Sequence, residues 1–398
     1  MDRKSKDLTD DLIDVGLSGL DVLGGTAGIP ASLIIKTLKL LVKSVNYLSG
    51  RFEPTMFLRL TNNELLEKYS LEKLLSFRVG LTDITLPQSV LLNNSKERIK
   101  LKDLDVILDP VFPVYQFPSI IGSKAEELKM KQLKIRPKED YESTTIRLNY
   151  IIESDNKISL HVSKAHYTDY LATNYSMDAK LDGWSNSLRD TIHKGGKLCE
   201  LSTSPLANHI GIGILFFTCD GYLVLPTRSK DKVNISRGAI SPSVSGATNF
   251  DEDMDTMINP LLNSIRRESM EELNIEAADI DLQSVKFLGL TRELLRGGKP
   301  EAFFVGNLHC TKRVTEEKFK AKPRDRENSK LDFFEFGTSL QKDIPVKSEL
   351  SCEYNILFNR VKTFLDANSK RLSLPFITNF MLWLEYVRHY VQDRVEVE

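Results

Sequence analysis

The sequence predicts an α/β protein in which a domain built on a mixed sheet follows a mainly helical accessory region. With 398 residues the chain exceeds one ordinary domain. One amphipathic helix pattern lies between two pairs of short apolar segments bounded by turn residues, as expected for buried strands. We place the accessory region at 1–130 and the α/β domain at 131–398. The strand-like segments are residues 211–217, 222–229, 285–292 and 300–308.

The accessory region contains one amphipathic helix pattern, at residues 31–48. Lys36, Lys39 and Lys43 share one face, and most other positions are apolar. Such a helix can lie on a membrane surface or contact a partner protein, or it can pack within its own domain with the lysines facing solvent. The uncharged run at 22–35 is too short to span a bilayer, and the acidic start lacks the basic region of a signal peptide.

The segments on either side of the strands predict how the α/β domain begins and ends. Residues 124–142 are rich in lysine and glutamate, which indicates a linker or an exposed helix. Alternating polarity at 145–152 and 158–162 predicts a hairpin that opens the domain. Two helices are predicted at its end, at 351–368 and 374–392.

The helix between the two strand pairs has clear start and stop signals. Asn259 offers a capping side chain, and Pro260 suits the first turn, where no backbone donor is needed. The apolar positions that follow have the i, i+3, i+4 spacing of a buried stripe. Asn274 suits the end because asparagine tolerates the left-handed conformation of a C-terminal cap.

Three carboxylates lie along one edge of this helix. At about 100° per residue, Glu268, Glu271 and Glu272 fall within about one quadrant of the helix surface. Anions held so close repel one another, so their arrangement is explained if they bind a divalent cation. Mg²⁺ is the natural candidate because it prefers carboxylate oxygens and keeps positions open for water and phosphates. Mn²⁺ is the alternative.

The segment resembles the second half of the Nudix box, G-x5-E-x7-R-E-U-x-E-E-x-G-U, in which U is aliphatic. Five residues match, whereas the first half differs: the glycine of the box falls on Asp253, its first glutamate on Asn259 and its late glycine on Asn274. The resemblance implies an α/β/α sandwich with a mixed sheet, and glutamates that hold Mg²⁺ against a diphosphate. The matching residues, which it implies are catalytic apart from Ile275, are Arg267, Glu268, Glu271, Glu272 and Ile275.

A second segment resembles one branch of that family, which hydrolyses UDP-glucose and UDP-galactose. Residues 167–174, with Asp169 and Asn174, are similar to its Tyr-x-Asp-Phe-Leu-x-Thr-Asn segment, and 288–292 and 301–303 are similar to two of its strands. The resemblance covers roughly 145–315 and implies a nucleotide-linked substrate such as UDP-glucose. Asp169 and Asn174 then belong to the substrate site, or they build a turn.

Basic residues are needed to hold the phosphates of such a substrate. The candidates are Arg228 at a strand end, Arg237 in the long loop 229–259, and Arg292, each of which can instead form a surface ion pair. The loop, which contains Gly246, is a phosphate-contacting lid or a disordered insertion. Glu301 is a candidate metal ligand or base.

Composition and the remaining residues exclude several classes of function. A formal net charge of -1 gives no support for nucleic-acid binding, and the four cysteines show no paired spacing, which fits a reducing cytoplasm. His166, His193 and His209 show no ligand spacing, so we interpret them as structural or exposed. Three functions remain: a Mg²⁺-dependent diphosphatase, a nucleotide sensor without turnover, or a protein that acts through its N-terminal helix.

Overall fold

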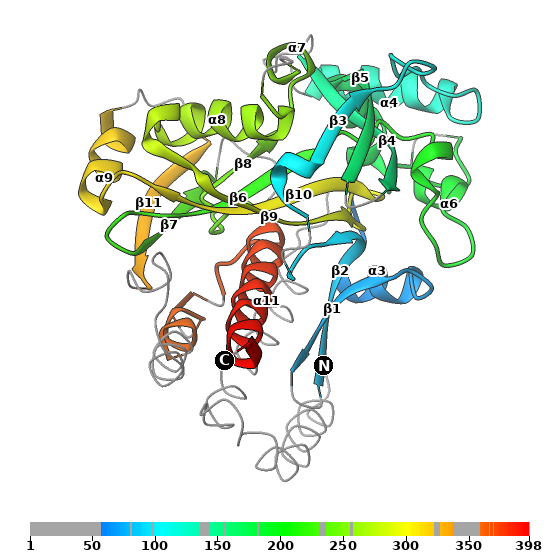
Figure 1. Cartoon of the computed structure of the whole chain (residues 1–398). Coiled ribbons are helices and arrows are strands. Elements are labelled where there is room, and N and C mark those ends of the chain that lie inside the picture. Colours follow the sequence, from blue (N-terminus) through cyan, green and yellow to red (C-terminus); the bar gives the residue numbers. More distant parts are fainter. Residues whose placement is uncertain are drawn as a thin grey trace.

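The computed structural model contains two β-sheets and helices that pack against them (Figure 1). The elements discussed below are those of the described residues. These are 57–397 without 80–81, 97–98, 136–142, 155–156, 181–182, 231–235, 255–257, 322–326, 337–358, 366 and 369. The predicted helix at 31–48 therefore lies outside the described residues. Within them, no helix is long and apolar enough to cross a membrane.

The larger sheet has eight strands within the described residues, in the order β1-β2-β9-β10-β6-β7-β11, with β8 paired to β6. β10 and β6 run parallel and the other neighbours are antiparallel, so the sheet is mixed as predicted. Its strands are β1 (Leu74–Val79), β2 (Thr82–Asn93), β6 (Gly211–Phe217), β7 (Tyr222–Arg228), β8 (Val244–Ala247), β9 (Ile280–Glu293), β10 (Lys299–Leu308) and β11 (Asn328–Glu335).

The smaller sheet has the order β3-β5-β4. The predicted hairpin is confirmed as β4 and β5, which pair antiparallel, while β3 pairs parallel with β5. Because β2 lies beside β9 and β3 beside β5, the predicted division at residue 130 does not coincide with a break between sheets. The strands are β3 (Leu104–Leu108), β4 (Thr144–Ser154) and β5 (Lys157–His166).

Helices cover both faces of the larger sheet, with α8 (Pro260–Leu273) on one face and α11 (Leu374–Val397) on the other (Figure 1). Leu261 and Ile265 of α8 pack in one core cluster with Ile212 and Ile214 of β6. The opposite face of β6 packs against α11 in a second cluster that includes Phe217 and the aromatic side chains of that helix. Alternation along β6 therefore supplies both cores.

The remaining helices have 4 to 14 residues. Of the two alternatives predicted for 124–142, a linker or an exposed helix, the described part is helical in α4, and the buried residues of α4 pack against α5 in a third core cluster. The described part of the predicted helical region also contains β1 to β3, so it is not mainly helical. These helices are α3 (Asn62–Lys68), α4 (Gly122–Ile135), α5 (Tyr167–Ala172), α6 (Leu188–Ile192), α7 (Phe250–Asp253) and α9 (Lys312–Ala321).

The predicted strands and the central helix are confirmed, with two differences. Asn259 caps α8 by accepting from Leu261 N, and Asn274 ends it with a φ of 59°. The expected hairpin of β6 with β7 reduces to one pair, Phe217 with Leu223, because β6 pairs instead with β10 and β8. The loop 229–259, predicted to be a phosphate-contacting lid or a disordered insertion, contains β8 and α7 among its described residues, and β8 pairs with β6. Of the two predicted C-terminal helices, α11 is confirmed, and residues 359–365 are helical.

Candidate active site

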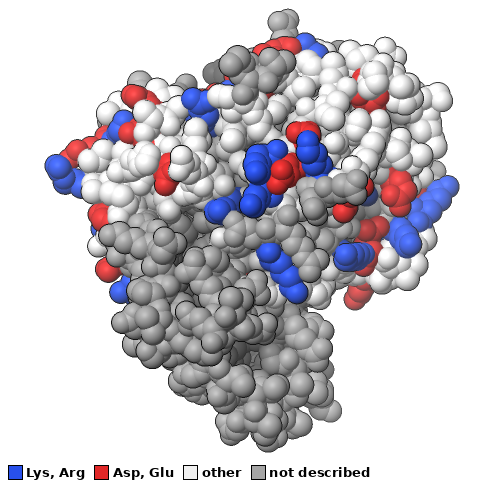
Figure 2. All heavy atoms as spheres, in the orientation of Figure 1, with Lys and Arg blue, Asp and Glu red and all other residues white. Residues whose placement is uncertain are grey.

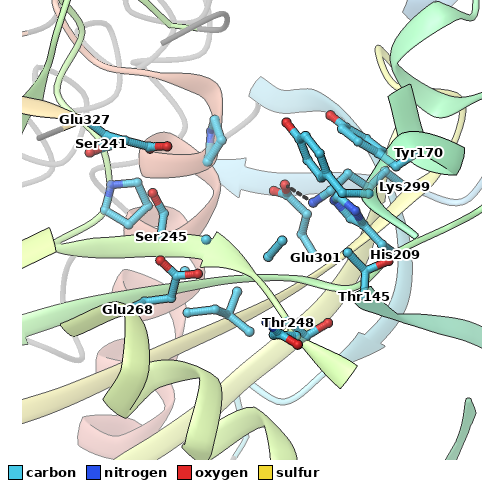
Figure 3. A pocket seen from close by; sticks show the side chains of 18 of the residues that line it. Thr145, Tyr170, His209, Ser241, Ser245, Thr248, Glu268, Lys299, Glu301 and Glu327 are labelled. Carbon is cyan, nitrogen blue, oxygen red and sulfur yellow. Dashed lines mark hydrogen bonds and ion pairs between the residues drawn. The ribbon is translucent and has the colours of Figure 1, made fainter. Parts of the chain in front are cut away.

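A cavity of about 600 Å³ lies where the two sheets meet α8. Its walls come from β4, α5, β8, α8 and the start of β10, so residues distant in sequence share it. Figure 3 shows Glu268 and Ser245 at one end, and Tyr170, His209 and Lys299 at the other. We call these ends the α8 wall and the far wall. The volume suits a small organic ligand.

The α8 wall contains two of the three predicted glutamates. Glu268 and Glu271 line the cavity, and Glu268 is buried against β8. A Cβ atom at Gly246 would collide with the Glu268 carboxyl group, so only glycine allows the strand and this carboxylate to approach so closely. The predicted site residue Gly246 therefore acts through its lack of a side chain.

Arg267 holds these carboxylates in place. Its Nη1 lies 2.9 Å from Glu268 Oε1 and 3.4 Å from Glu271 Oε1. On its other side, Nε and Nη2 donate to the two oxygens of Asp253 at 3.1 Å each, and Nη2 also donates to Ala247 O at 2.7 Å. Asp253 and Ala247 thus hold Nε and Nη2 of Arg267, and this fixes the position of Nη1 between Glu268 and Glu271.

Asp253, on which the glycine of the Nudix box falls, was not among the predicted site residues. It is 1% exposed, and besides Arg267 it accepts from Ser264 Oγ at 2.5 Å and from Asn249 N at 2.6 Å. A buried carboxylate with this many donors is a rigid brace. Its position at the end of α7, beside α8, could not be inferred from spacing alone.

Glu272, the third predicted metal ligand, is not among the residues that line the cavity. Its Oε2 accepts from Ser245 N at 3.1 Å, and Oε1 lies 3.9 Å from Arg228 Nη1. Burial raises the pKa of Glu272 to about 8. Burial also raises the pKa of Glu268 well above its ordinary value, with further increases from Glu272 and Glu271. These carboxyl groups thus lie where a nearby cation would favour their ionised form.

Arg228 lines the cavity, whereas the other two candidate arginines, Arg237 and Arg292, do not. Arg228 Nη2 lies 2.6 Å from Glu327 Oε2, and Arg228 Nη1 lies 3.4 Å from Ser245 Oγ. Arg237 is exposed next to the cavity residue Ser236. Arg292 is buried outside the cavity, where its Nε donates to Gly298 O at 3.2 Å. Burial lowers the pKa of Arg292.

The far wall contains Glu301 within a network of buried charges. Its Oε1 accepts from Lys299 Nζ at 2.9 Å and from Arg296 Nη2 at 2.5 Å, and Arg296 also pairs with Glu293. Burial alone would raise the pKa of Glu301, but the two cations hold it below its ordinary value. Glu301 is thus in the cavity, as predicted, but it is committed to an internal ion-pair network.

His209, predicted to be structural or exposed, is buried, and it also lines the cavity. Its ring stacks on Tyr170 with centroids 4.0 Å apart and an interplanar angle of 23°. Burial, with Lys299 and Arg296 nearby, lowers the pKa of His209 well below its ordinary value. No local spacing signals this role, because Tyr170 is on α5 and His209 precedes β6.

The side chains of Asp169 and Asn174 hold backbone segments that carry residues of the far wall. Asp169 Oδ2 accepts from His166 N at 3.0 Å at the start of α5. Asn174 Nδ2 donates to Arg296 O at 2.9 Å and to Asn208 Oδ1 at 3.1 Å, and its Oδ1 accepts from Asn208 N at 2.8 Å. Asn174 therefore supports the residue before His209. Neither side chain lines the cavity.

The oxygen donors of the α8 wall fit a hard divalent cation. Within the described part of the chain no group of three or more His, Cys, Asp or Glu side chains converges as a complete metal site. Mg²⁺, however, is commonly held by one or two carboxylates, with waters and phosphates completing its shell. Of the three predicted glutamates of α8, Glu268 and Glu271 lie on the cavity wall, and buried Glu272 Oε1 has no hydrogen-bond partner among the described residues.

Charged side chains of both signs lie interspersed on the molecular face shown in Figure 2, with several of them gathered near its centre. The residues that line the cavity also carry both signs, because Arg228, Arg267 and Lys299 occur there together with Glu268, Glu271 and Glu301. The cavity is therefore not a uniformly basic channel.

Comparisons with known proteins leave the family open. No family model and no curated protein matches the chain. The structure of DR0079 from Deinococcus radiodurans aligns with a TM-score of 0.23 and 18% identity, covering 38% of this chain and 82% of that one. The Nudix hydrolase RenU from M. smegmatis aligns with a TM-score of 0.21 and 12% identity, covering 42% of this chain and 90% of that one. Likeness at these TM-scores decides neither fold nor activity.

Proposed function

We propose that the protein hydrolyses the diphosphate linkage of a nucleoside diphosphate joined to another group, and that it needs Mg²⁺ to do so. The observation that carries this proposal is the α8 wall, where Glu268 and Glu271 line a cavity of about 600 Å³. Arg228 lines the same cavity and is positioned for a phosphate oxygen. The likeness of 267–275 to the Nudix box supports the same reaction class.

The roles of the side chains follow from their contacts. Glu268 and Glu271 would hold the cation, which when bound supplies neutralisation of the diphosphate charge and a water of lowered pKa. Arg267 keeps the two carboxylates in register, because it contacts both and is itself held by Asp253. Arg228 can turn from exposed Glu327 towards a phosphate, whose oxygens suit its planar guanidinium group.

The proposed substrate is a UDP-sugar such as UDP-glucose, and Mn²⁺ is expected to replace Mg²⁺. The sugar assignment comes from the resemblance of residues 167–174 to the UDP-sugar branch. In the structure that segment supplies Tyr167 and Tyr170 to the far wall.

The test is phosphorus NMR of the full chain with Mg²⁺ and UDP-glucose, ADP-ribose, NAD or a dinucleoside polyphosphate. We expect the parent to cleave one compound and the Glu268→Gln, Glu271→Gln double variant to be at least about 100-fold slower. The matched control is Glu317→Gln, which changes an exposed glutamate on α9. Equal rates for parent and double variant would disprove the mechanism.

A second candidate is a nucleotide sensor that binds without turnover. It is favoured by Arg267, which lies between the carboxylates, and by Asn259, whose Nδ2 donates to Leu104 O at 2.6 Å where the Nudix box has a glutamate. The same samples separate the two candidates. A nucleotide that raises the melting temperature but stays intact in the NMR spectrum would favour the sensor.

A further inference from the structure

The far wall contains buried polar atoms that have no hydrogen-bond partner among the described residues. Thr145 is 2% exposed and His209 is 3% exposed, yet Thr145 Oγ1 and His209 Nδ1 lack a hydrogen bond. Both residues line the cavity, and Figure 3 shows them near each other. Their strand segments are adjacent, because Ile210 N donates to Ile146 O at 2.9 Å. Polar groups buried in this way are normally satisfied, so a ligand is expected to complete them.

The ion-pair network around these atoms has no net charge. Lys299 and Arg296 are balanced by Glu301 and Glu293, with which they form ion pairs. His209 is neutral near pH 7, because burial and the two cations lower its pKa well below the ordinary value. An anionic group here would compete with Glu301 for the same cations, and a cationic group would meet Lys299 and Arg296. A neutral ligand group is favoured.

The aromatic rings also limit what can bind. One face of His209 is stacked on Tyr170 with centroids 4.0 Å apart, and Tyr167 lies parallel to His209 at 6.3 Å with an interplanar angle of 15°. The unpaired hydrogen-bonding atom of His209, Nδ1, is therefore at the edge of the ring, and the unpaired atom beside it is the hydroxyl oxygen of Thr145. Edge-on donors and acceptors suit the hydroxyl groups of a ligand better than the face of a base.

We propose that Thr145 and His209 form a subsite for the uncharged, hydroxyl-bearing group on the far side of the diphosphate, and that they determine specificity for it. This inference rests on the function proposed above and adds which end of the substrate meets which wall. His209 is held for this task by Asn174, whose hydrogen bonds position the preceding Asn208. Asn208 itself has a left-handed φ of 41°.

The experiment compares the affinities of three ligands that differ only beyond the diphosphate: UDP, UDP-glucose and UDP-glucuronate. Titration calorimetry is performed with the full chain in Ca²⁺, which keeps oxygen ligation. The unchanged protein is expected to bind UDP-glucose about tenfold or more tighter than UDP-glucuronate, whose carboxylate replaces a hydroxymethyl group.

The key variant is His209→Phe, which keeps a ring for the stack and removes both nitrogens. We expect about tenfold weaker binding of UDP-glucose and unchanged binding of UDP. Thr145→Val, which removes only the hydroxyl, should change the same ratio in the same direction and replaces His209→Phe if that variant does not fold. The matched control is His309→Phe at an exposed histidine, which should leave the ratio unchanged.

The outcomes separate this inference from the proposed function when the cleavage assay is performed on the same samples. Equal affinity for UDP-glucose and UDP-glucuronate, or equal weakening of UDP and UDP-glucose by His209→Phe, would overturn the subsite even if UDP-glucose is cleaved. Selective binding without cleavage would support the subsite and refute hydrolysis. Absence of binding by all three ligands would overturn the subsite and the UDP-sugar assignment, and the proposed reaction would then stand only if another compound of the panel is cleaved.

Discussion

Gly246→Ala is expected to separate activity from stability. The added Cβ would lie far closer than 3.0 Å to the carboxyl group of Glu268, a distance that real Cβ atoms essentially never show. The backbone of Gly246 is outside the left-handed region, so alanine fits its conformation. Because the atom in the way is the end of a flexible side chain, the carboxyl group moves and the strand stays.

The size of this displacement sets the expected effect. To reach ordinary contact at 3.4 Å the carboxyl group must move by about 1 Å or more. A misplacement of about 1 Å in a catalytic site costs on the order of 100-fold in rate. The free energy of unfolding should change by less than about 1 kcal/mol, because alanine also restricts the unfolded chain. The melting temperature should therefore remain nearly unchanged.

The assay measures the cleavage rate, Mn²⁺ affinity by electron paramagnetic resonance, and urea unfolding on one preparation. Gly213→Ala is the matched control, since its Cβ would meet Phe303 Cδ1 and Pro242 Cγ at 3.4 Å and leave Glu268 untouched. Full activity and Mn²⁺ affinity in Gly246→Ala would refute the reasoning. Equal losses in both variants would instead indicate a general effect on the sheet.

Three further predictions concern the same wall. Asp253→Asn should lower the free energy of unfolding, measured in urea, by about 2 kcal/mol or more, because it breaks a buried ion pair with Arg267. The control Asp251→Asn, at the surface, should lower it by less than about 1 kcal/mol. Similar losses in the two variants would contradict the role of Asp253 as a brace for Arg267. With a chelator present, the free energy of unfolding should fall as pH rises from about 5 to 8. In this range Glu272 keeps its proton in the folded state, where its pKa is raised to about 8, and has lost it in the unfolded state, where its pKa is 4.5. An equally steep fall in Glu272→Gln would exclude this group as the cause. EDTA should abolish cleavage, and Mg²⁺ at about 100 times its Kd should add about 2.7 kcal/mol to the free energy of unfolding; turnover that persists in EDTA would rule out the metal.

The α8 helix was predictable because its signals are local. Asn259 and Pro260 start it, and Asn274 ends it in the left-handed conformation, as the residue types indicated. Four strands of the larger sheet, β6, β7, β9 and β10, were visible as apolar runs, and the pairing of β9 with β10 was predicted with them. The strands β1, β2, β8 and β11 were not predicted. The pairing of β6 with β10 and β8 was not predictable either, because it joins segments distant in sequence and apolar runs carry no information about register.

The far wall was beyond prediction for a related reason. His209 and Tyr170 come from different elements, and each was interpreted from its own neighbourhood. Asp169 and Asn174, predicted as substrate-site or turn residues, do not line the cavity. Asp169 caps the start of α5, and Asn174 holds Asn208, the residue before His209. Sequence similarity identifies such a segment without telling which of its side chains point into a cavity.

Asp253 shows how the site keeps a rigid α8 wall although the sequence departs from the Nudix box. The glutamate expected ahead of the helix is Asn259, which is used for capping and for Leu104 O. The brace instead comes from the end of α7, where Asp253 accepts hydrogen bonds from Nε and Nη2 of Arg267. Arg267 then has no free nitrogen for a substrate, so phosphate binding falls to Arg228. The departure in sequence therefore moves the brace to another residue and leaves the orientation of Glu268 intact.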